Sequence, residues 1–190
     1  MTEKKEGQSK EKKSARENPM RNIRLEKVTI NMGVGEPGPR LENAKKIVEA
    51  ISGSKAVITK SKKRNTFGVA KGREIGVKTT LRGEAAMQFL KNAVRGVDSR
   101  LHPRVFDANG NFSFGIKEYI NIPGAKYDPQ VGIVGMDIAV TLERPGFRVK
   151  KRSYRPAKVG RRHAIRNEEA MKWAEKELNV KVTAEQERGY

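Results

Sequence analysis

Residues 73–81 read REIGVKTTL, and along this stretch two kinds of side chain alternate. In an extended chain Ile75, Val77 and Leu81 fall on one face, while Lys78 and Thr80 fall on the other. A repeat of two with one apolar face is typical of a β-strand that is buried on one side only. This stretch therefore predicts a sheet with one covered face and one open face.

Other stretches repeat the pattern. They are 22–32 (NIRLEKVTINM), 111–122 (NFSFGIKEYINI) and 136–142 (MDIAVTL), with a shorter strand expected at 56–59 (AVIT). In the second of these, Tyr119 alternates with the apolar side chains and is assigned to the open face. Sheets that face solvent on one side are generally antiparallel. The fold class predicted is α+β, with a mainly antiparallel sheet, helices packed on one face, an open polar and basic face, and long loops.

Three segments carry apolar residues at helical spacing. They are 40–51 (RLENAKKIVEAI), 83–97 (GEAAMQFLKNAVRGV) and 167–178 (NEEAMKWAEKEL). Each has one apolar stripe, which would pack on the covered face of the sheet. Asn167 is the expected N-cap of the last helix, because Asn is a favoured residue at that position. Trp173 is the side chain expected to dock this helix.

The charge of the chain points to a polyanionic partner. Lys and Arg number 41 against 22 Asp and Glu, so the formal net charge is +19. Two stretches concentrate it: residues 61–83 hold seven basic residues and one Glu, and residues 147–163 hold eight basic residues and no acidic one. The second stretch has no regular period and includes Pro156 and Gly160, which predicts an extended arm. A nucleic acid is the first partner to consider.

Several classes are disfavoured by what the chain lacks. It has no cysteine, which excludes disulfides and thiol chemistry. No apolar run approaches a membrane span of about 18 residues. Residues 1–19 are almost entirely polar and carry six basic and four acidic residues, so we expect a disordered tail without a secretory signal. A cytoplasmic setting follows.

A glycine motif at 33–38, GVGEPG, matches the dinucleotide-binding pattern G-x-G-x-x-G. Pro37 and Pro39 flank its third glycine, where a helix with free N–H groups should begin, and the strands read as antiparallel. We instead expect the loop to offer backbone N–H groups to phosphate, beside Asn31. His102 and His163 have no evident catalytic partner, and His163 is assigned to a phosphate-binding arm.

Three hypotheses therefore stand on the residues alone. The chain is a structural RNA-binding protein, a free nucleic-acid-binding protein such as an RNA chaperone or chromatin factor, or a small dinucleotide-dependent enzyme. Charge does not separate the first two.

Four segments carry a resemblance to a known family. They are 29–36 (TINMGVGE), 51–84 (ISGSKAVITKSKKRNTFGVAKGREIGVKTTLRGE), 106–124 (FDANGNFSFGIKEYINIPG) and 135–146 (GMDIAVTLERPG). In order and spacing they resemble the large-subunit ribosomal protein five family, which binds 5S ribosomal RNA. Residues 161–178 (RRHAIRNEEAMKWAEKEL) are similar to its archaeal and eukaryotic branch.

The resemblance implies a non-enzymatic, cofactor-free ribosomal protein of the central protuberance, working in the cytoplasm without a membrane or a homo-oligomer. Its implied partners are 5S rRNA, large-subunit rRNA, peptidyl-site tRNA and, through an intersubunit bridge, small-subunit ribosomal protein thirteen. The organisation expected is a disordered tail at 1–19, a 5S rRNA-binding α+β domain at 20–146, and a basic arm with a C-terminal helix at 147–190.

Residues in three groups are expected to touch RNA, and none to be catalytic or bind metal. The resemblance gives direct 5S rRNA contacts to Asn31, Phe67 and Thr80, and the full set predicted for that RNA is Asn31, Gly33, Gly35, Lys60, Phe67, Lys78, Thr80 and Arg82. The set expected to reach tRNA is Lys62, Lys63, Arg64, Lys71 and Arg73. The set expected to bind rRNA phosphates from the arm is Lys150, Lys151, Arg152, Arg155, Arg161 and Arg162.

Overall fold

The structure is a computed structural model that describes residues 18–64 and 68–183. Most of the predicted tail lies outside these residues, and so does Phe67.

The centre of the molecule is a five-stranded antiparallel sheet. Its strands are β1 (Arg24–Gly33), β2 (Val57–Lys60), β3 (Glu74–Leu81), β5 (Phe112–Ile116) and β6 (Met136–Glu143). Their order across the sheet is β2-β3-β1-β6-β5. The four strands expected at 22–32, 56–59, 73–81 and 136–142 are confirmed. An all-antiparallel sheet also excludes the parallel dinucleotide-binding fold.

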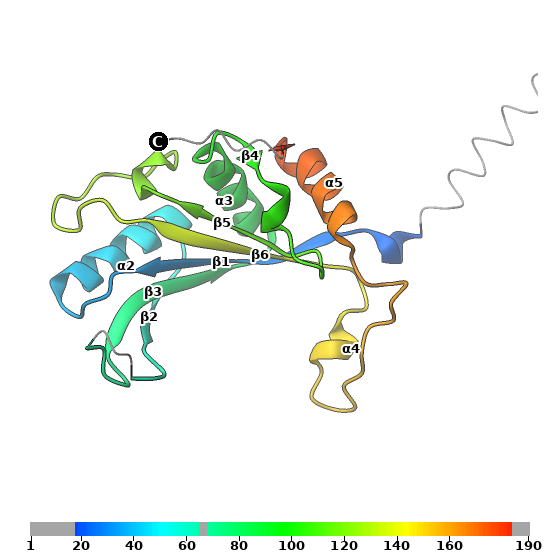
Figure 1. Ribbon diagram of the computed structural model, residues 1–190, viewed down its shortest axis with the longest axis horizontal. Helices are drawn as coiled ribbons and strands as arrows, with labels where there is room; N and C mark the ends of the chain where they lie inside the picture. The colour runs from blue at the N-terminus through cyan, green and yellow to red at the C-terminus, as the bar shows by residue number, and fades with distance from the viewer. Residues whose placement is uncertain (1–17, 65–67, 184–190) are drawn as a thin grey trace, which may run out of the picture.

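Three helices lie on the same side of this sheet, as Figure 1 shows. They are α2 (Pro39–Ser52), α3 (Gly83–Arg95) and α5 (Asn167–Leu178). Their apolar stripes are buried, for example at Leu41 and Val48 in α2 and at Leu90 and Val94 in α3. The α+β class with helices on one face is therefore confirmed.

Shorter elements complete the chain. A small parallel pair, β4 (Arg100–Leu101) with β7 (Lys181–Val182), lies beside α5. The other short elements are the 3-10 turns η1 (Pro19–Arg21), η2 (Pro103–Val105) and η3 (Tyr119–Asn121), and the one-turn helix α4 (Arg148–Lys151).

The covered face of the sheet is the one that the alternation assigned to it. In β1, Val28, Ile30 and Met32 are buried, while Asn31 between them is exposed. In β3 the buried Thr79 is satisfied because its hydroxyl donates to the carbonyl of Lys55 at 3.1 Å. The burial of these side chains follows directly from the period of two in the sequence.

The strand predicted at 111–122 is too long. It ends at Ile116, and the chain then turns so that the Tyr119 N–H donates to the carbonyl of Val134 at 3.2 Å. Tyr119 is fully buried, and its hydroxyl accepts a hydrogen bond from the N–H of Asp128 at 3.0 Å. Its assignment to the open face is wrong, because this ring anchors the following loop on the core.

The last helix begins as predicted, but its cap differs. Arg166 is the N-cap, and its N–H donates to Glu169 Oε2 at 3.0 Å. Asn167 is the first helical residue and its amide donates to the carbonyl of Phe106 at 3.4 Å. Trp173 contacts the core but is only partly buried; Ala170 and Ala174 provide the fully buried face of α5.

Candidate nucleic-acid interface

The uncovered side of the sheet, here called the open face, carries small and polar side chains in register. In its central row Asn31 lies between Lys78 of β3 and Asp137 of β6. Directly opposed residues in an antiparallel sheet have Cβ atoms about 5 Å apart, so the three side chains are neighbours. The row is continued by Val57 and Gly115, and the next row consists of Thr80, Thr29, Ala139 and Ser113.

This central row offers a cation, an amide and a carboxylate side by side. All three side chains are exposed. A carboxylate repels phosphate but accepts hydrogen bonds from base edges and from ribose 2′-hydroxyls. The row is therefore chemically suited to the bases and sugars of RNA, and less to the phosphate backbone alone.

The glycines at the end of β1 differ from their predicted role. The N–H groups of Val34 and Gly35 both donate to the carbonyl of Ile75, at 3.0 Å and 2.9 Å. They are not free for phosphate, so that prediction is wrong for these two groups. Gly33 is exposed at the edge of the open face, and a Cβ atom added there would meet no described atom within 4 Å. Gly33 therefore leaves space for the close approach of a ligand.

The basic loop, residues 61–73, projects from the end of β2 and β3. Its base is closed by hydrogen bonds between Ser61 and Arg73 and between Gly72 and Ser61, both 2.8 Å long. Lys60 lies 3.3 Å from Glu74 at this base, so part of its charge is balanced. The loop cations Lys62, Lys63, Arg64, Lys71 and Arg73 are exposed.

The arm, residues 147–163, is not simply extended. It begins with α4 and folds back, with the N–H of Ala157 donating to the carbonyl of Val149 at 3.1 Å. Lys151 forms ion pairs with Glu26 of β1 and Glu143 of β6. Burial alone would lower the pKa of Lys151, but these two carboxylates raise it. Lys151 therefore fastens the arm to the sheet, a role hidden in sequence because Glu26 lies far along the chain and Glu143 lies outside the arm.

The other arm cations predicted to bind RNA stay on the surface. Arg152, Arg155, Arg161, Arg162 and Lys150 are exposed. His163 is turned inward: its Nε2 lies 2.8 Å from the carbonyl of Pro145 and its ring meets that of Phe147 edge-on. The assignment of His163 to phosphate binding is not supported, because this ring is occupied in holding the arm.

The base of the arm is held by a buried arginine. Arg144 is only 4% exposed and donates through Nη1 to the carbonyls of His163 and Ala164, at 3.3 Å and 3.2 Å. Its Nη2 lies 2.9 Å from Glu169 of α5. One side chain thus joins the end of β6, the return of the arm and the last helix.

The contact with Arg144 helps to lower the pKa of the Glu169 carboxyl group. Burial acts to raise its pKa, but hydrogen bonds from the Arg166 N–H and from Arg144 outweigh burial, so the pKa lies below its ordinary value of 4.5. A group whose pKa is lowered by folding stabilises the fold when it is ionised. That contribution is present above the unfolded value and is lost as the pH falls through the folded one.

We therefore expect Glu169→Gln to destabilise the protein at neutral pH and to make little difference in acid. The free energy of unfolding of variant and parent should converge as the pH falls below 4.5. Glu168→Gln is the matched control, since Glu168 is exposed in the same helical turn. Urea titrations at several pH values measure the difference, and a gap that persists unchanged in acid would contradict the assignment.

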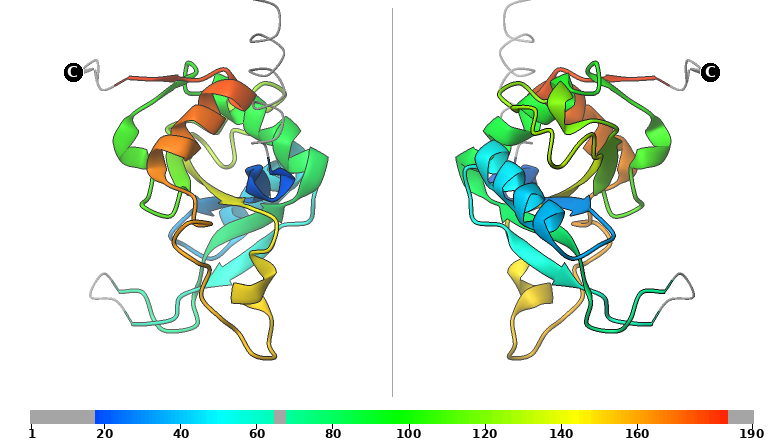
Figure 2. Two further views of the ribbon diagram at one scale, coloured as in Figure 1. Left: turned by 90° about the vertical axis from the view of Figure 1, so that its right-hand side faces the viewer. Right: turned by 90° about the vertical axis from the view of Figure 1, so that its left-hand side faces the viewer.

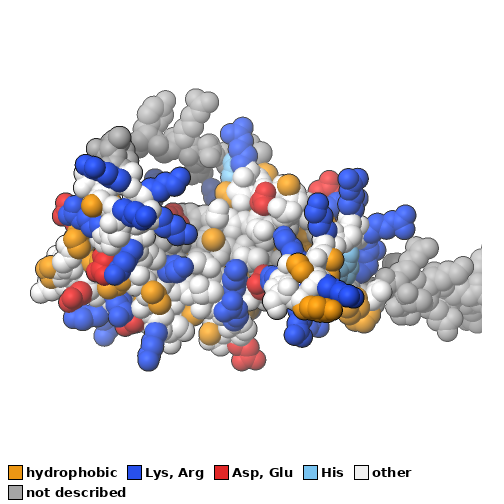
Figure 3. All heavy atoms as spheres, turned by 90° about the horizontal axis from the view of Figure 1, so that it is seen from below, with side chains coloured by type: hydrophobic (Ala, Val, Ile, Leu, Met, Phe, Trp, Pro, Cys, Tyr) orange, Lys and Arg blue, Asp and Glu red, His pale blue; other side chains and the backbone are white. Residues whose placement is uncertain are grey.

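The loop and the arm flank the open face on one side of the molecule. Figures 1 and 2 show both projecting away from the helices, the loop from one end of the sheet and α4 with the arm from the other. Seen from that side, the middle is mostly backbone and uncharged polar side chains, while Lys and Arg gather at both ends (Figure 3). The structure brings Asn31, Gly33, Lys78 and Thr80 together between the two projections. Arg82 is exposed at the start of α3, and Gly35 lies in the loop before α2.

Three further residues of this surface were not predicted as contacts. Thr29 and Asp137 belong to the rows around Asn31, and the alternation of their strands was the signal that could have found them. Tyr154 is 73% exposed at the tip of the arm, with the guanidinium of Arg155 5.2 Å from its ring centroid. An exposed aromatic among cations can stack on a nucleic-acid base.

The described residues offer little support for a membrane span, a metal site or catalysis by histidine. Among residues 18–64 and 68–183, no helix has the length and apolar character needed to cross a bilayer. In the same ranges, no three His, Asp or Glu side chains gather as a metal site. His102 is engaged by its own turn, where its Nδ1 accepts from the N–H of Arg104 at 3.0 Å.

Known proteins of one family are similar in sequence to this chain. A family model described as ribosomal protein L5 matches residues 18–69, and a second model, which describes the C-terminus of the same ribosomal family, matches residues 74–173. The large ribosomal subunit protein uL5 of Sulfolobus acidocaldarius is 49% identical over 168 residues, covering 88% of this chain and 94% of that protein. The uL5 proteins of Nanoarchaeum equitans and Methanococcus vannielii are 48% and 45% identical, over 87% and 88% of this chain and 99% and 94% of their own lengths.

Proposed function

This chain belongs to the ribosomal protein L5 family, and from that premise we propose that its open face binds 5S ribosomal RNA. As a member of the family it is a structural constituent of the large ribosomal subunit. It is part of the ribosome in the cytoplasm and is not an enzyme. The RNA and the contacts are the part that we propose.

The observation that carries the proposal is the pairing of a shallow polar sheet face with two cationic projections. A-form RNA displays 2′-hydroxyls and base edges in a wide, shallow minor groove, which suits contact with Asn31, Asp137 and the threonines around them. Cations at both ends of the face would meet the flanking phosphates and release their counterions. The surface thus suits contacts to the bases and sugars of RNA as well as contacts to its phosphates.

We assign the three residue groups as follows. Within a 5S rRNA-binding domain at 20–146, the contacts to 5S rRNA come from the sheet and its borders: Asn31, Gly33, Gly35, Lys60, Phe67, Lys78, Thr80 and Arg82. The basic loop reaches peptidyl-site tRNA. The arm, which together with the last helix makes up 147–190, binds large-subunit rRNA. A bridge to small-subunit ribosomal protein thirteen is proposed on the family resemblance alone.

The test is a comparison of two nucleic acids. We expect the full chain to bind a 5S rRNA transcript more tightly than duplex DNA of equal length at the same moderate salt concentration. A free, unspecific nucleic-acid-binding protein would bind both alike, because its affinity comes from phosphate contacts alone. Equal affinities would therefore overturn the proposed function.

Two single substitutions probe the centre of the open face. Asn31→Ala should weaken 5S rRNA binding by about 1–3 kcal/mol, because it leaves buried RNA groups without a partner. Gly33→Val should weaken binding to a similar degree by blocking close approach, while leaving the free energy of unfolding almost unchanged, since the added Cβ has open space. Binding isotherms and urea titrations on the same preparations give both quantities.

The control is Ala85→Val, which enlarges an exposed residue of α3 on the covered side of the sheet. It should not change RNA affinity. Gly35→Val is not a clean probe, because Gly35 has a φ of +86° and a valine there would strain the backbone. If Asn31→Ala and Gly33→Val both bind 5S rRNA like the parent protein, the open face is not the binding surface.

A further inference from the structure

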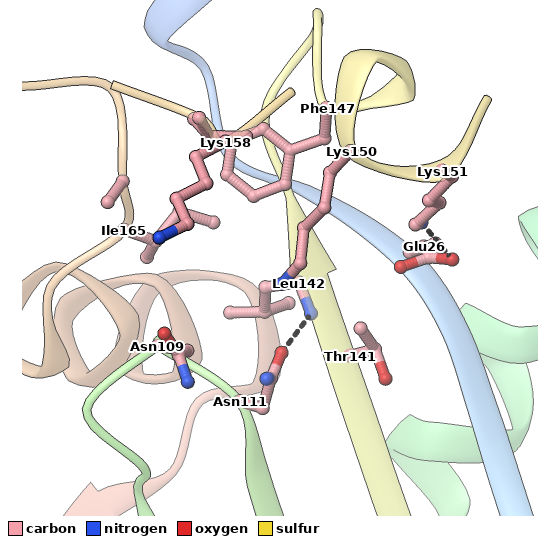
Figure 4. Close-up of a pocket in the computed structure, with 12 residues that line it drawn as sticks. Glu26, Asn109, Asn111, Thr141, Leu142, Phe147, Lys150, Lys151, Lys158 and Ile165 are labelled. Carbon is pink, nitrogen blue, oxygen red and sulfur yellow. Dashed lines mark hydrogen bonds and ion pairs between the residues drawn. The ribbon is translucent and has the colours of Figure 1, made fainter. Parts of the chain in front are cut away.

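A cavity of about 280 Å³ lies where the arm folds over the end of the sheet. It is lined by the arm, by β6 and by the turn that leads into β5, and it is partly open to solvent (Figure 4). Pockets that bind small molecules have volumes of roughly 300 Å³ or more, so this cavity lies near the lower end of that range. Its lining includes two amides, an aromatic ring and two lysines: Asn109, Asn111, Phe147, Lys150 and Lys158.

Two of its cations have no ionic partner. Lys151 also lines the cavity, but its ammonium is taken by Glu26 and Glu143. Lys150 and Lys158 form no ion pair with any residue that the structure describes. Their chains run on either side of the Phe147 ring and their ammonium groups point toward the two asparagines (Figure 4). The cavity therefore holds two unneutralised positive charges, which suit one phosphate group.

The asparagines supply a donor and an acceptor. Asn111 Oδ1 accepts from the N–H of Leu142 at 3.3 Å, just before β5 begins at Phe112. This leaves the Asn111 NH2 group without an acceptor among the described residues. Asn109 is oriented the other way, since its NH2 group donates to Asp107 at 3.2 Å and its oxygen is left as an acceptor.

An aromatic ring completes the set. Phe147 is partly buried and is held edge-on by His163, with 5.8 Å between ring centroids. A bare anion would need the cations but not the ring or the paired amides. A nucleobase uses both, because it stacks on aromatic rings and presents donors and acceptors on its edge.

We propose that this cavity receives one unpaired nucleotide of the RNA bound by the protein. Its phosphate meets Lys150 and Lys158, its base packs on Phe147, and the base edge bonds to Asn111 and Asn109. A base within a duplex is paired and stacked, so the nucleotide comes from a loop, bulge or end. The inference rests on the proposed function, since it presupposes that the open face and arm lie on RNA.

Asn111→Asp is the sharpest test. The variant keeps an oxygen for the Leu142 N–H, so folding should be preserved, but it removes the free donor and places a negative charge in the cavity. Gln88→Glu is the matched control, since it makes the same change of charge at an exposed site of α3. The thermal unfolding midpoint of each variant verifies that it folds.

The readout is ultraviolet crosslinking of large ribosomal subunits that carry each variant, followed by mass spectrometry. The parent and Gln88→Glu subunits should give one crosslinked nucleotide at Phe147, and Asn111→Asp should reduce its yield about tenfold, as expected for a lost bond and an added repulsion. Replacing Lys150 and Lys158 with Gln should reduce it too, whereas replacing Lys91 and Arg95, which are exposed on α3, with Gln should not.

The outcomes separate this inference from the function beneath it. If β1 and β3 crosslink to 5S rRNA while Phe147 does not, or if Asn111→Asp matches Gln88→Glu, the nucleotide site is overturned and the proposed function stands. If no crosslink to 5S rRNA forms on the sheet, the proposed function fails and this inference fails with it.

Discussion

Replacing Lys62, Lys63, Lys71 and Arg73 with Gln is expected to weaken the binding of peptidyl-site tRNA to the ribosome by about 100-fold at moderate salt, while 5S rRNA stays in the subunit. All four side chains are exposed on the basic loop, away from the central row of the open face. None of them forms an ion pair within the described ranges, so their charge is available to phosphate.

The size of the effect follows from counterion release. Each phosphate contact contributes about 0.7–0.9 to the slope of log affinity against log salt concentration, so loss of four contacts should flatten the slope by about three. Filter binding of tRNA to ribosomes over a range of salt concentrations measures both the affinity and the slope. Quantifying 5S rRNA in the same subunits tests whether this RNA is retained, as we expect.

A matched control removes the same number of charges elsewhere. Lys91, Arg95, Lys172 and Lys176 are exposed on α3 and α5, on the helical side of the sheet. Their replacement with Gln should leave the tRNA affinity and its salt slope unchanged. Subunits that lose 5S rRNA but bind tRNA normally after the loop substitution would show that the loop grips 5S rRNA instead.

Arg144→Met is expected to lower the free energy of unfolding by about 2–4 kcal/mol, because it removes the charged donor from two backbone carbonyls and from Glu169, whose side chain is 39% exposed. The guanidinium is 4% exposed and serves three acceptors: the carbonyls of His163 and Ala164 and the carboxylate of Glu169. Methionine fills similar space but donates no hydrogen bond, so these acceptors lose their partner.

Urea titration with a signal from Trp173 measures this effect, because that side chain lies on α5 next to the arginine's partner Glu169. Arg148→Met is the control, since Arg148 is exposed only four residues later and should change stability by less than about 0.5 kcal/mol. Arg144→Lys should recover part of the loss, because it restores the charge but not the forked geometry. An Arg144→Met protein that unfolds at the parent's midpoint would rule out this role.

Local patterns in the sequence were sufficient to predict the strands of the sheet and the three main helices. The alternation around Ile30 and Val77 determined which face of each strand is buried, because side chains in a strand point to opposite sides by geometry. The spacing of apolar residues located α2, α3 and α5 for the same kind of reason. The concentration of charge in 61–83 and 147–163 identified the two cationic segments, since charge is a property of composition and needs no fold.

Tertiary contacts decided what these patterns could not. Tyr119 follows the alternation of β5, yet it is buried, because the strand ends first and its hydroxyl bonds to Asp128. His163 lies among arginines in the sequence but faces inward, bonded to Pro145. The partner that decides the orientation lies 9 residues from Tyr119 and 18 residues from His163. A repeat of two residues along a strand carries no information about partners at these separations.

The candidate site shows the same division. Asn31, Lys78 and Thr80 were assigned to one face by parity within their own strands, but the neighbour Asp137 is set by the register between β1 and β6, which parity does not fix. Lys151 belongs to a segment with no acidic residue, and only the fold brings Glu26 and Glu143 to it. The cavity beside Phe147 unites residues 109, 111, 147, 150 and 158, which come together because the arm turns back over the sheet and Arg144 holds it there. Composition and period thus determined the elements and the charge of this protein, whereas long-range hydrogen bonds and ion pairs decided which of its charged and polar groups remain free to meet RNA.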